Sequence, residues 1–429
     1  MPYSTIIKTL AHQVDLKIYH NRATGYNATT MRILLLNHNL IWRGTFFRCM
    51  GFARELARQG HQVDLWTVSR EWNSSGCVEP LDGVRIWQTP RWGRPGRHDG
   101  GYALLDNLAR LASISIDQWD VIHAFDHRPN VLLPWFLQRS LTRFSSQPPL
   151  FVSDWCDWWT EGGITTARRP FAWIDRLEQR IEVGSKQISD GVTVISSVLR
   201  ERARSAGIED ERLLTLPAGV MSDAFPVIEK QDARNQLGIA SDKPLLGFIG
   251  YSLWDIQLLA DLFAAVKEQR NDALLLAIGG GVEDSALQPL RERFQPDADV
   301  LLPGVIPFEQ VPAYLAACDV LLLPLEDTLA NRARVPNKLA DYFASGRPVV
   351  ASHVGETASL IKQHQAGILA YNPNNFAQAC VELLNQPSKA HEMGAKGRQT
   401  AETEWAYQTL TKQLVEFYQR LLNKRLGKT

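Results

Sequence analysis

Three cationic residues gather around the predicted start of one helix in segment 321–352. These are Arg332, Arg334 and Lys338, and backbone amides that lack an intrahelical partner lie at the same helix start. Such amides, together with guanidinium and ammonium groups, suit a diphosphate. Asp341 follows one turn further along, where its carboxylate can accept hydrogen bonds from a ribose diol. The segment therefore predicts a nucleotide site.

Two apolar strands are expected to hold this helix in place. Leu321–Leu323 is a short apolar run that ends at a proline, and Pro348–Ala351 opens another, so both are typical of buried parallel strands. Pro336 suits the first turn of the helix, and Gly346 suits the left-handed position just beyond its end. An alternative is that the segment is only a capped helix and strand of some α/β domain with surface cations.

The order and spacing of these residues resemble the donor-site segment of the two-Rossmann glycosyltransferases, in particular glycosyltransferase family 4. In that family the helix carries a glutamate five residues before the glycine of a G-x-P-V motif, and Asp341 stands at this position relative to Gly346. The family's second glutamate, eight residues earlier, contacts donor-sugar hydroxyls, and here that position is Ala333. The resemblance therefore implies a nucleotide-sugar donor but leaves the sugar open.

Further donor contacts are implied by three glycine-containing loops of the second half. The strand and helix of Leu245–Leu259 enclose a loop whose backbone amides can approach a phosphate. The arginine and lysine that many relatives carry after this strand are missing, so the phosphates are assigned to the cations near Lys338. The predicted donor-binding residues are Gly250, Tyr251, Ser252, Gly304, Val305, Arg332, Arg334, Lys338, Leu339, Asp341 and Glu356.

Polar residues follow several predicted strands of the first half, at the edge where open α/β sheets place their ligands. The predicted catalytic residues are Asp126, Asp154 and His123. The predicted acceptor-binding residues are Gly44, Thr45, Arg48, Asp157 and Trp158. Two structural alternatives stay open: His123 as a hydrogen-bonded histidine inside the sheet, and the tryptophans near Trp158 as a cover for the core.

Length and composition limit the classes of function that the chain can have. The chain of 429 residues suits two or three domains, and 46 Lys and Arg against 46 Asp and Glu give no net charge that would argue for nucleic acid. Five scattered cysteines predict neither a disulfide framework nor a zinc site, and they fit a reducing compartment. No apolar run is long enough to span a bilayer.

Alternating strands and helices predict an α/β protein, and the resemblance implies the GT-B architecture, with two Rossmann-like domains facing an interdomain cleft. The expected parts are an N-terminal extension at 1–30, an acceptor domain at 31–226, a donor domain at 227–403, and a C-terminal helix at 404–429 that packs back on the first domain. The extension is interpreted as an added arm or as an upstream start codon.

The resemblance implies a retaining, metal-independent transferase without a cofactor, which moves a sugar from a UDP- or GDP-sugar to a glycan, lipid or small-molecule acceptor. Polysaccharide biosynthesis in the cytoplasm, with peripheral contact at the inner face of the membrane, is the expected setting. Two alternatives remain: a nucleotide-sugar epimerase of the same fold, and a catalytically silent binding or scaffold protein, which Ala333 and the missing phosphate pair suggest.

Overall fold

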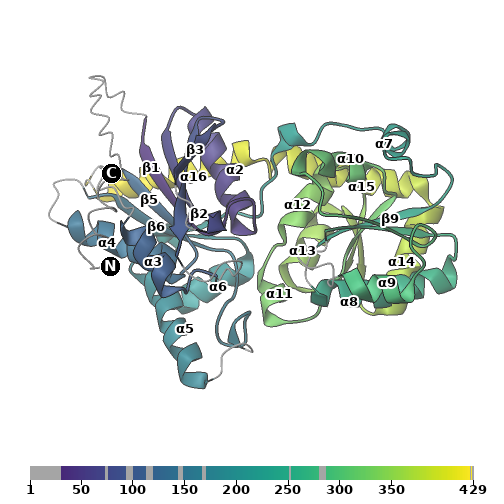
Figure 1. The fold of residues 1–429 in the computed structure, drawn as a ribbon, viewed down its shortest axis with the longest axis horizontal. Coiled ribbons are helices and arrows are strands. Elements are labelled where there is room, and N and C mark those ends of the chain that lie inside the picture. The colour runs from purple at the N-terminus through teal and green to yellow at the C-terminus, as the bar shows by residue number, and fades with distance from the viewer. Residues whose placement is uncertain are drawn as a thin grey trace, which may run out of the picture. The chain divides into compact units, whose positions relative to one another are not determined.

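Two sheets, each covered by helices, make up the part of the chain described here (Figure 1). The structure is a computed structural model, and it describes residues 30–72, 76–92, 100–112, 119–143, 148–166, 171–250, 253–279, 287–425 and 427. Apart from Thr30, the predicted extension at 1–30 lies outside these residues.

The first sheet has eight strands in the order β3-β4-β2-β1-β5-β6-β7-β8. Its pairs are parallel except for the antiparallel pair of β3 and β4. The strands are β1 (Arg32–Leu40), β2 (Gln62–Trp72), β3 (Gly76–Leu81), β4 (Val84–Arg91), β5 (Val121–Phe125), β6 (Leu150–Trp155), β7 (Gly191–Val194) and β8 (Leu213–Thr215).

Helices cover both faces of this sheet. The core on one face joins the sheet to α2 and to the C-terminal helix α16, and α3 and α4 pack on the opposite face. The helices are α2 (Thr45–Arg58), α3 (Leu104–Ala112), α4 (Pro129–Leu141), α5 (Ala172–Gln187), α6 (Ser197–Ser205) and α16 (Tyr407–Arg425). Short 3-10 turns lie at η2 (Asp210–Arg212) and η3 (Ser222–Ala224).

The second sheet has six parallel strands in the order β11-β10-β9-β12-β13-β14. They are β9 (Leu245–Gly250), β10 (Leu274–Gly279), β11 (Val300–Gly304), β12 (Val320–Leu323), β13 (Val349–Ser352) and β14 (Gly367–Ala370). β12 and β13 are the two strands predicted around the candidate nucleotide helix. They are wholly apolar apart from Ser352, as expected for strands buried on both faces.

Helices also cover both faces of the second sheet, with α10 and α15 on one side of β9 and α8 and α9 on the other (Figure 1). The helices are α7 (Lys230–Leu237), α8 (Leu253–Gln269), α9 (Gln288–Arg293), α10 (Val311–Ala316), α11 (Leu329–Ala333), α12 (Asn337–Ala344), α13 (Gly355–His364), α14 (Pro373–Asn385) and α15 (Pro387–Thr403), with a 3-10 turn η5 (Phe308–Gln310).

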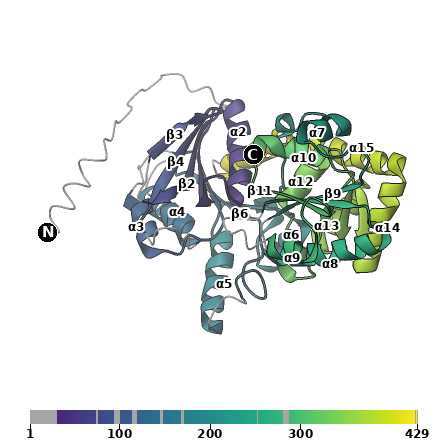
Figure 2. The ribbon, with the colours of Figure 1, turned by 45° about the vertical axis from the view of Figure 1, so that its right-hand side comes forward.

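The C-terminal helix α16 returns to the first sheet (Figures 1 and 2). Its apolar side chains, including Leu414, Phe417 and Tyr418, share a core with β1, β5 and α2. The two largely parallel sheets and this returning helix confirm the predicted fold class. The two Rossmann-like sheets thus each have an edge formed by the carboxyl ends of their strands, where ligands of open α/β sheets bind.

Candidate active site

Lys338 lies at the start of α12, against the carboxyl end of β9. Its Nζ is 4.3 Å from the centroid of the Phe248 ring and 3.5 Å from Oδ2 of Asp255. Gly250 leaves room for it, because a Cβ at that position would lie 3.1 Å from Nζ. Burial and, to a smaller extent, the Arg334 charge lower the pKa of Lys338 to about 8, against the opposing effect of Asp255. An incoming anion would therefore stabilise the protonated, charged form of this lysine.

Arg334 and Arg332 lie in different environments although they are two residues apart. The Nε of Arg334 is buried and has no hydrogen-bond partner, and its charge reaches both Lys338 and Asp157. Arg332 is exposed and donates two hydrogen bonds to the Asp327 carboxylate, at 2.5 and 2.7 Å. The geometry therefore favours Arg334 as the second phosphate ligand, and the role predicted for Arg332 stays untested.

Asp341 is half-buried one turn beyond Lys338, and burial raises its pKa to about 7. No residue that the structure describes donates a hydrogen bond to its carboxylate, so the acceptor capacity of that group is unused. Leu339, which follows Lys338 in the sequence, is fully buried and fixes the helix in the apolar core. A ribose diol would supply the two donors that the carboxylate lacks.

Glu356 connects the second unit to the first. It lies in the first turn of α13, and its carboxylate accepts from the backbone amide of Ser197 at 3.0 Å and from the hydroxyl of the same residue. It thus caps the start of α6. Beside it, Ser196 donates its hydroxyl to the backbone carbonyl of Ala333, whose side chain is fully buried.

The remaining predicted donor residues lie on the loops that follow β9 and β11. Gly304 ends β11 with a φ of 75°, and Val305 follows it with 72% of its surface exposed. Tyr251 and Ser252 lie outside the described residues. The predicted contacts of these residues with a base and a phosphate stay predictions.

On the first sheet, Asp126 is the centre of a buried charged cluster. It follows β5 with a φ of 97°, a backbone conformation that is uncommon for residues other than glycine. Its carboxylate lies 2.9 Å from Nδ1 of His127, 3.3 Å from Nδ1 of His38 and 3.6 Å from Nε of Arg128. Burial alone would raise the pKa of Asp126, but these three neighbours hold it far below its ordinary value.

The cluster also raises the pKa of His127. Burial opposes protonation of this imidazole, but the Asp126 carboxylate and Glu178 favour it. His127 Nε2 lies 3.6 Å from Oε1 of Glu178. A fixed carboxylate can orient a hydroxyl, and an imidazole beside it can exchange a proton with that hydroxyl.

Asp154 forms a buried bidentate ion pair. It accepts from Nε and a terminal nitrogen of Arg48 at 3.1 and 3.0 Å, and from the Thr193 hydroxyl at 2.6 Å. Arg48 also donates to the backbone carbonyls of Leu216 and Pro217. Both ionic side chains are at most 2% exposed. The pair therefore joins α2, β6 and the segment after β8, and no open position remains on it for a substrate.

His123 is also enclosed. Its Nδ1 lies 2.6 Å from the Tyr418 hydroxyl, and its Nε2 lies 3.1 Å from the Thr193 hydroxyl. Burial lowers the pKa of His123 to about 3, so the ring is neutral at physiological pH. The geometry thus favours the structural alternative that the sequence left open, a hydrogen-bonded histidine inside the sheet.

Asp157 lies at the carboxyl end of β6, and the Arg334 charge reaches it from the second unit. Burial raises the pKa of Asp157 to about 6, against the opposing effect of Arg334. The indole of Trp158 packs against Arg202, whose guanidinium carbon lies 4.1 Å from the ring centroid. That arrangement occupies one face of the ring, so a sugar could use only the other.

Gly44 and Thr45 begin α2 beside β1. A Cβ on Gly44 would lie 2.4 Å from Nδ2 of Asn39, and its φ of 50° and ψ of −120° also require glycine. The Thr45 hydroxyl donates to Oδ1 of Asn37 at 2.8 Å and lies 3.3 Å from Nδ1 of His38. This loop therefore adjoins the Asp126 cluster.

Comparison with known proteins assigns both halves of the chain. Residues 44–219 match the family model of the glycosyl transferase 4-like domain, and residues 243–386 match that of glycosyl transferases group 1. The chain belongs to the group 1 glycosyltransferases. The recognised family and the expected transferase class are thereby confirmed.

Similar proteins agree with this assignment. An uncharacterized glycosyltransferase of Methanocaldococcus jannaschii is 21% identical over 87% of this chain and 94% of its own length. A GDP-mannose-dependent alpha-(1-6)-phosphatidylinositol monomannoside mannosyltransferase of Mycobacterium tuberculosis is 26% identical over 54% of this chain and 63% of its own length.

Two solved structures share the fold. Sucrose-phosphate synthase from Thermosynechococcus elongatus superposes with a TM-score of 0.73 at 19% identity, over 92% of this chain and 100% of that chain. The Anabaena protein HepE in complex with UDP and glucose gives a TM-score of 0.67 at 16% identity, over 90% of this chain and 98% of that chain. These likenesses confirm the GT-B architecture.

Two histidines of this glycosyltransferase were missed by sequence reasoning. His38 lies two residues after the apolar run of β1, and His127 directly follows Asp126. Their signal was available, because polar residues at the carboxyl ends of two adjacent parallel strands should meet.

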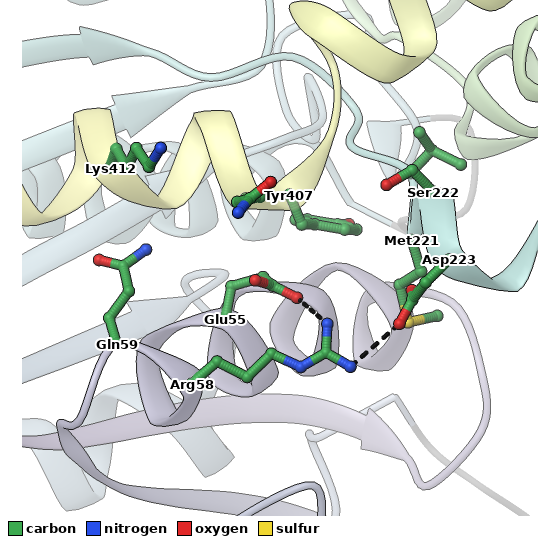
Figure 3. A pocket seen from close by; sticks show the side chains of 10 residues that line it. Glu55, Arg58, Gln59, Met221, Ser222, Asp223, Tyr407 and Lys412 are labelled. Atoms are coloured by element: carbon green, nitrogen blue, oxygen red, sulfur yellow. Dashed lines mark hydrogen bonds and ion pairs between the residues drawn. The ribbon is translucent and has the colours of Figure 1, made fainter.

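A cavity of about 290 Å³ is lined by residues that do not include any of the predicted donor-binding ones (Figure 3). It lies between α2, the segment after β8 and the start of α16, and Arg58 there bonds both Glu55 and Asp223. In the described part of the chain, no group of three or more His, Cys, Asp or Glu side chains is arranged to hold a metal ion. Metal independence stays a prediction.

Proposed function

We propose that this protein transfers a sugar from a UDP- or GDP-sugar to a carbohydrate or lipid-linked acceptor with retention of anomeric configuration. The observation that carries the proposal is the pair of Lys338 and Arg334, two partly buried cationic groups. Burial and the Arg334 charge lower the pKa of Lys338, Asp255 lies 3.5 Å from its Nζ, and the buried Nε of Arg334 has no hydrogen-bond partner among the described residues. A diphosphate would complete this arrangement.

The donor is proposed to lie across the carboxyl ends of β9 and β12. Lys338 and Arg334, with the free amides at the start of α12, hold the diphosphate. Asp341 accepts hydrogen bonds from the ribose. Relatives support the donor class: one uses GDP-mannose by name, and the HepE structure contains UDP and glucose.

Retention of configuration needs no nucleophile from the protein. The bond from the anomeric carbon to the diphosphate oxygen breaks, and the acceptor oxygen bonds to that carbon on the same face. The acceptor's proton passes to an oxygen of the departing β-phosphate, so the nucleoside diphosphate leaves with it. Lys338 and Arg334 stabilise the charge that develops on the diphosphate, and no protein-bound metal takes part.

The acceptor is proposed to bind on the first sheet, beside the Asp126 cluster. His38 and His127 fix the Asp126 carboxylate, and Asp157 lies within the electrostatic reach of Arg334. A hydroxyl placed between these groups would face the donor. We further propose that the protein acts in the cytoplasm, in polysaccharide or glycolipid synthesis at the inner face of a membrane.

The silent alternative is favoured by one observation. At the position where the family has a donor-contacting glutamate, the Ala333 side chain is fully buried and offers no polar atom. If activity is retained, the sugar hydroxyls must find other partners at that point. The silent protein would bind nucleotide without turning it over.

Release of UDP or GDP from a panel of donors, measured with and without lipid and glycan acceptors, separates the alternatives. A transferase releases nucleoside diphosphate in proportion to acceptor, whereas an epimerase yields an isomerised donor without acceptor. A silent protein shows only ligand stabilisation, which reaches about 2.7 kcal/mol when the ligand is at a hundred times its dissociation constant. Stabilisation without turnover under all donor and acceptor pairs would contradict the transferase.

A further inference from the structure

Three helices of the first unit carry apolar side chains that point away from the sheet. In the described part of the chain, most of the strongly exposed large apolar residues lie between Tyr102 and Ile188. On the second sheet and its helices, from Leu245 to Asn385, the corresponding described residues are only Val305 and Tyr371. The helix face is made of Leu104, Leu105 and Leu108 on α3, Leu133, Phe136 and Leu141 on α4, and Phe171, Trp173, Leu177 and Ile181 at and along α5.

Contacts place these helices on one side of the sheet. Along β6, side chains alternate, so that Leu150 and Val152 face the α2 and α16 core while Phe151 belongs to the α4 core. Lys186 of α5 donates to the Ser153 hydroxyl on that second face, and α3 packs on α4. The exposed side chains of the three helices therefore belong to one surface of the first unit, which we name the α3–α5 face.

The charges of α5 are unevenly placed. Two of its three acids point inward: Glu182 is fully buried and bonds Trp155 and Arg202, and Glu178 is buried beside His127. Asp175 is half-buried, and Lys186 is a buried cation on the inward side. The exposed positions of α5 carry Trp173, Leu177 and Ile181 at intervals of four residues, with Arg176 and Arg180 between them. Trp173 is 62% exposed. A helix with an apolar stripe and flanking cations lies in the interface of an anionic bilayer.

Charge supports this partner for the whole face. All residues of α3, α4 and α5 are described, and none of their Asp or Glu residues is exposed. A pocket of about 530 Å³ adjoins α4, and Arg139, Arg143 and Arg425 line it together with the single acid Asp190. Three guanidinium groups around one carboxylate suit an anionic headgroup at the edge of the face.

We infer that the α3–α5 face docks this protein on a membrane rich in anionic phospholipid, with the α5 stripe inserted among the headgroups and acyl chains. The proposed contact is peripheral, and no helix among the described residues is long and apolar enough to cross a membrane. The face is built from separate helices with exposed apolar side chains, and the exposed cations Arg176 and Arg180 lie among those of α5. These features fit a lipid surface better than the pocketed patch of a protein partner.

The face also adjoins the acceptor side of the candidate site. The inward side of α5 carries Glu178, which contacts His127 of the Asp126 cluster and the hydroxyl of Tyr102. One helix thus contacts the lipid with one side and the cluster with the other. It follows that the acceptor is lipid-linked and reaches Asp126 from the membrane; this second step rests on the proposed function.

Co-sedimentation of the full-length protein with vesicles tests the docking without donor or acceptor. The protein should bind vesicles that contain phosphatidylglycerol, bind phosphatidylcholine vesicles far less, and dissociate at high salt. Replacing Arg176 and Arg180 by glutamine should weaken partitioning about fivefold for each arginine. Leu177→Glu should weaken it about tenfold or more, because an apolar contact becomes charged. Tyr371→Glu, at a more exposed position of the second unit, is the control for an apolar-to-charged change and should bind as the unchanged protein does.

Three results would overturn the inference: equal binding to neutral and anionic vesicles, equal binding by the α5 variants and the unchanged protein, or no binding at all. A dimer in sedimentation that dissociates in Leu177→Glu would instead make the face an interface between two copies. Because the variants are at exposed positions, their thermal unfolding should match that of the unchanged protein. Turnover of a soluble acceptor by Leu177→Glu, with loss of turnover on a vesicle-borne one, would show that docking and chemistry are separate. Vesicle binding by a protein with no transferase activity would leave the docking intact and refute only the proposed function.

Discussion

Replacing Lys338 by alanine should weaken the binding of UDP or GDP far more than that of uridine or guanosine. A hydrogen bond between charged groups contributes about 1.5–3 kcal/mol, so the dissociation constant of the diphosphate should rise about 10- to 150-fold. The nucleoside has no phosphate and should lose little. Isothermal titration calorimetry with both ligands measures the difference directly.

The pH dependence of binding sharpens this test. Burial and Arg334 set the pKa of the free Lys338 at about 8, and a bound diphosphate would raise it. Free Lys338 is therefore half protonated near pH 8 and almost fully protonated well below it. Diphosphate affinity should fall as pH rises through 8, by about tenfold at pH 9. Lys338→Ala should not show this loss of affinity at high pH. Lys362→Ala, which changes an exposed lysine of α13, should still show it. Equal losses for nucleoside and diphosphate in Lys338→Ala would refute the phosphate role and make the lysine structural.

The two neighbouring arginines give a second comparison within the same loop. Arg334→Ala should weaken diphosphate binding about as much as Lys338→Ala, because its Nε is buried without a partner. Arg332→Ala should change binding little, because Asp327 already holds that guanidinium at the surface. The reverse order would restore the assignment of Arg332 made from the sequence.

Three further predictions follow from buried ionisable groups. Asp341 has a pKa of about 7 in the ligand-free protein, and ribose hydroxyls would favour its charged form. Ribonucleotide affinity should therefore increase as the pH rises towards 7. In a pH titration of binding, both Asp341→Asn and a 2′,3′-dideoxy ligand should remove that increase. Asp154→Asn should lower the free energy of unfolding in urea by about 3–5 kcal/mol, because Arg48 loses its charged partner. The double variant Arg48→Met with Asp154→Leu should recover most of this loss. A stable but inactive Asp154→Asn variant would instead support the catalytic role predicted from the sequence. His123 has a pKa of about 3 in the folded protein and 6.5 in the unfolded chain. The free energy of unfolding should therefore fall as the pH drops from 6.5 towards 3, by about 2 kcal/mol at pH 5. His123→Asn should lose this part of the pH dependence, and an unchanged pH dependence would contradict a buried neutral ring.

The fold could be predicted from the sequence because its strands are short apolar runs with breakers at their ends. Val320–Leu323 and Val349–Ser352 show this pattern on either side of α12. The returning helix α16 was also predictable, since its apolar residues recur at helical spacing. Local pattern and final packing agree in these elements.

The direction of individual side chains was harder to predict. Arg334 and Arg332 look equivalent in the sequence, but α11 ends at Ala333 and Arg334 follows in an extended conformation, so the two side chains leave the loop differently. On the first sheet, the alternation of side chains along each strand indicates which face a residue lies on. His123 lies on the same strand face as Val121 and Phe125, which belong to the α2 and α16 core. Asp154 likewise shares its face with Leu150 and Val152 of that core. That alternation favours buried roles for both.

The stereochemistry of the product tests the central claim most directly. An α-linked nucleotide-sugar donor that supports turnover should be incubated with its acceptor, and the anomeric configuration of the first product measured by proton NMR before any slow rearrangement. A retaining transfer predicts an α-linked product together with an equal amount of nucleoside diphosphate. A β-linked product would contradict the proposed same-face transfer, and isomerised donor without any glycosidic product would show the epimerase.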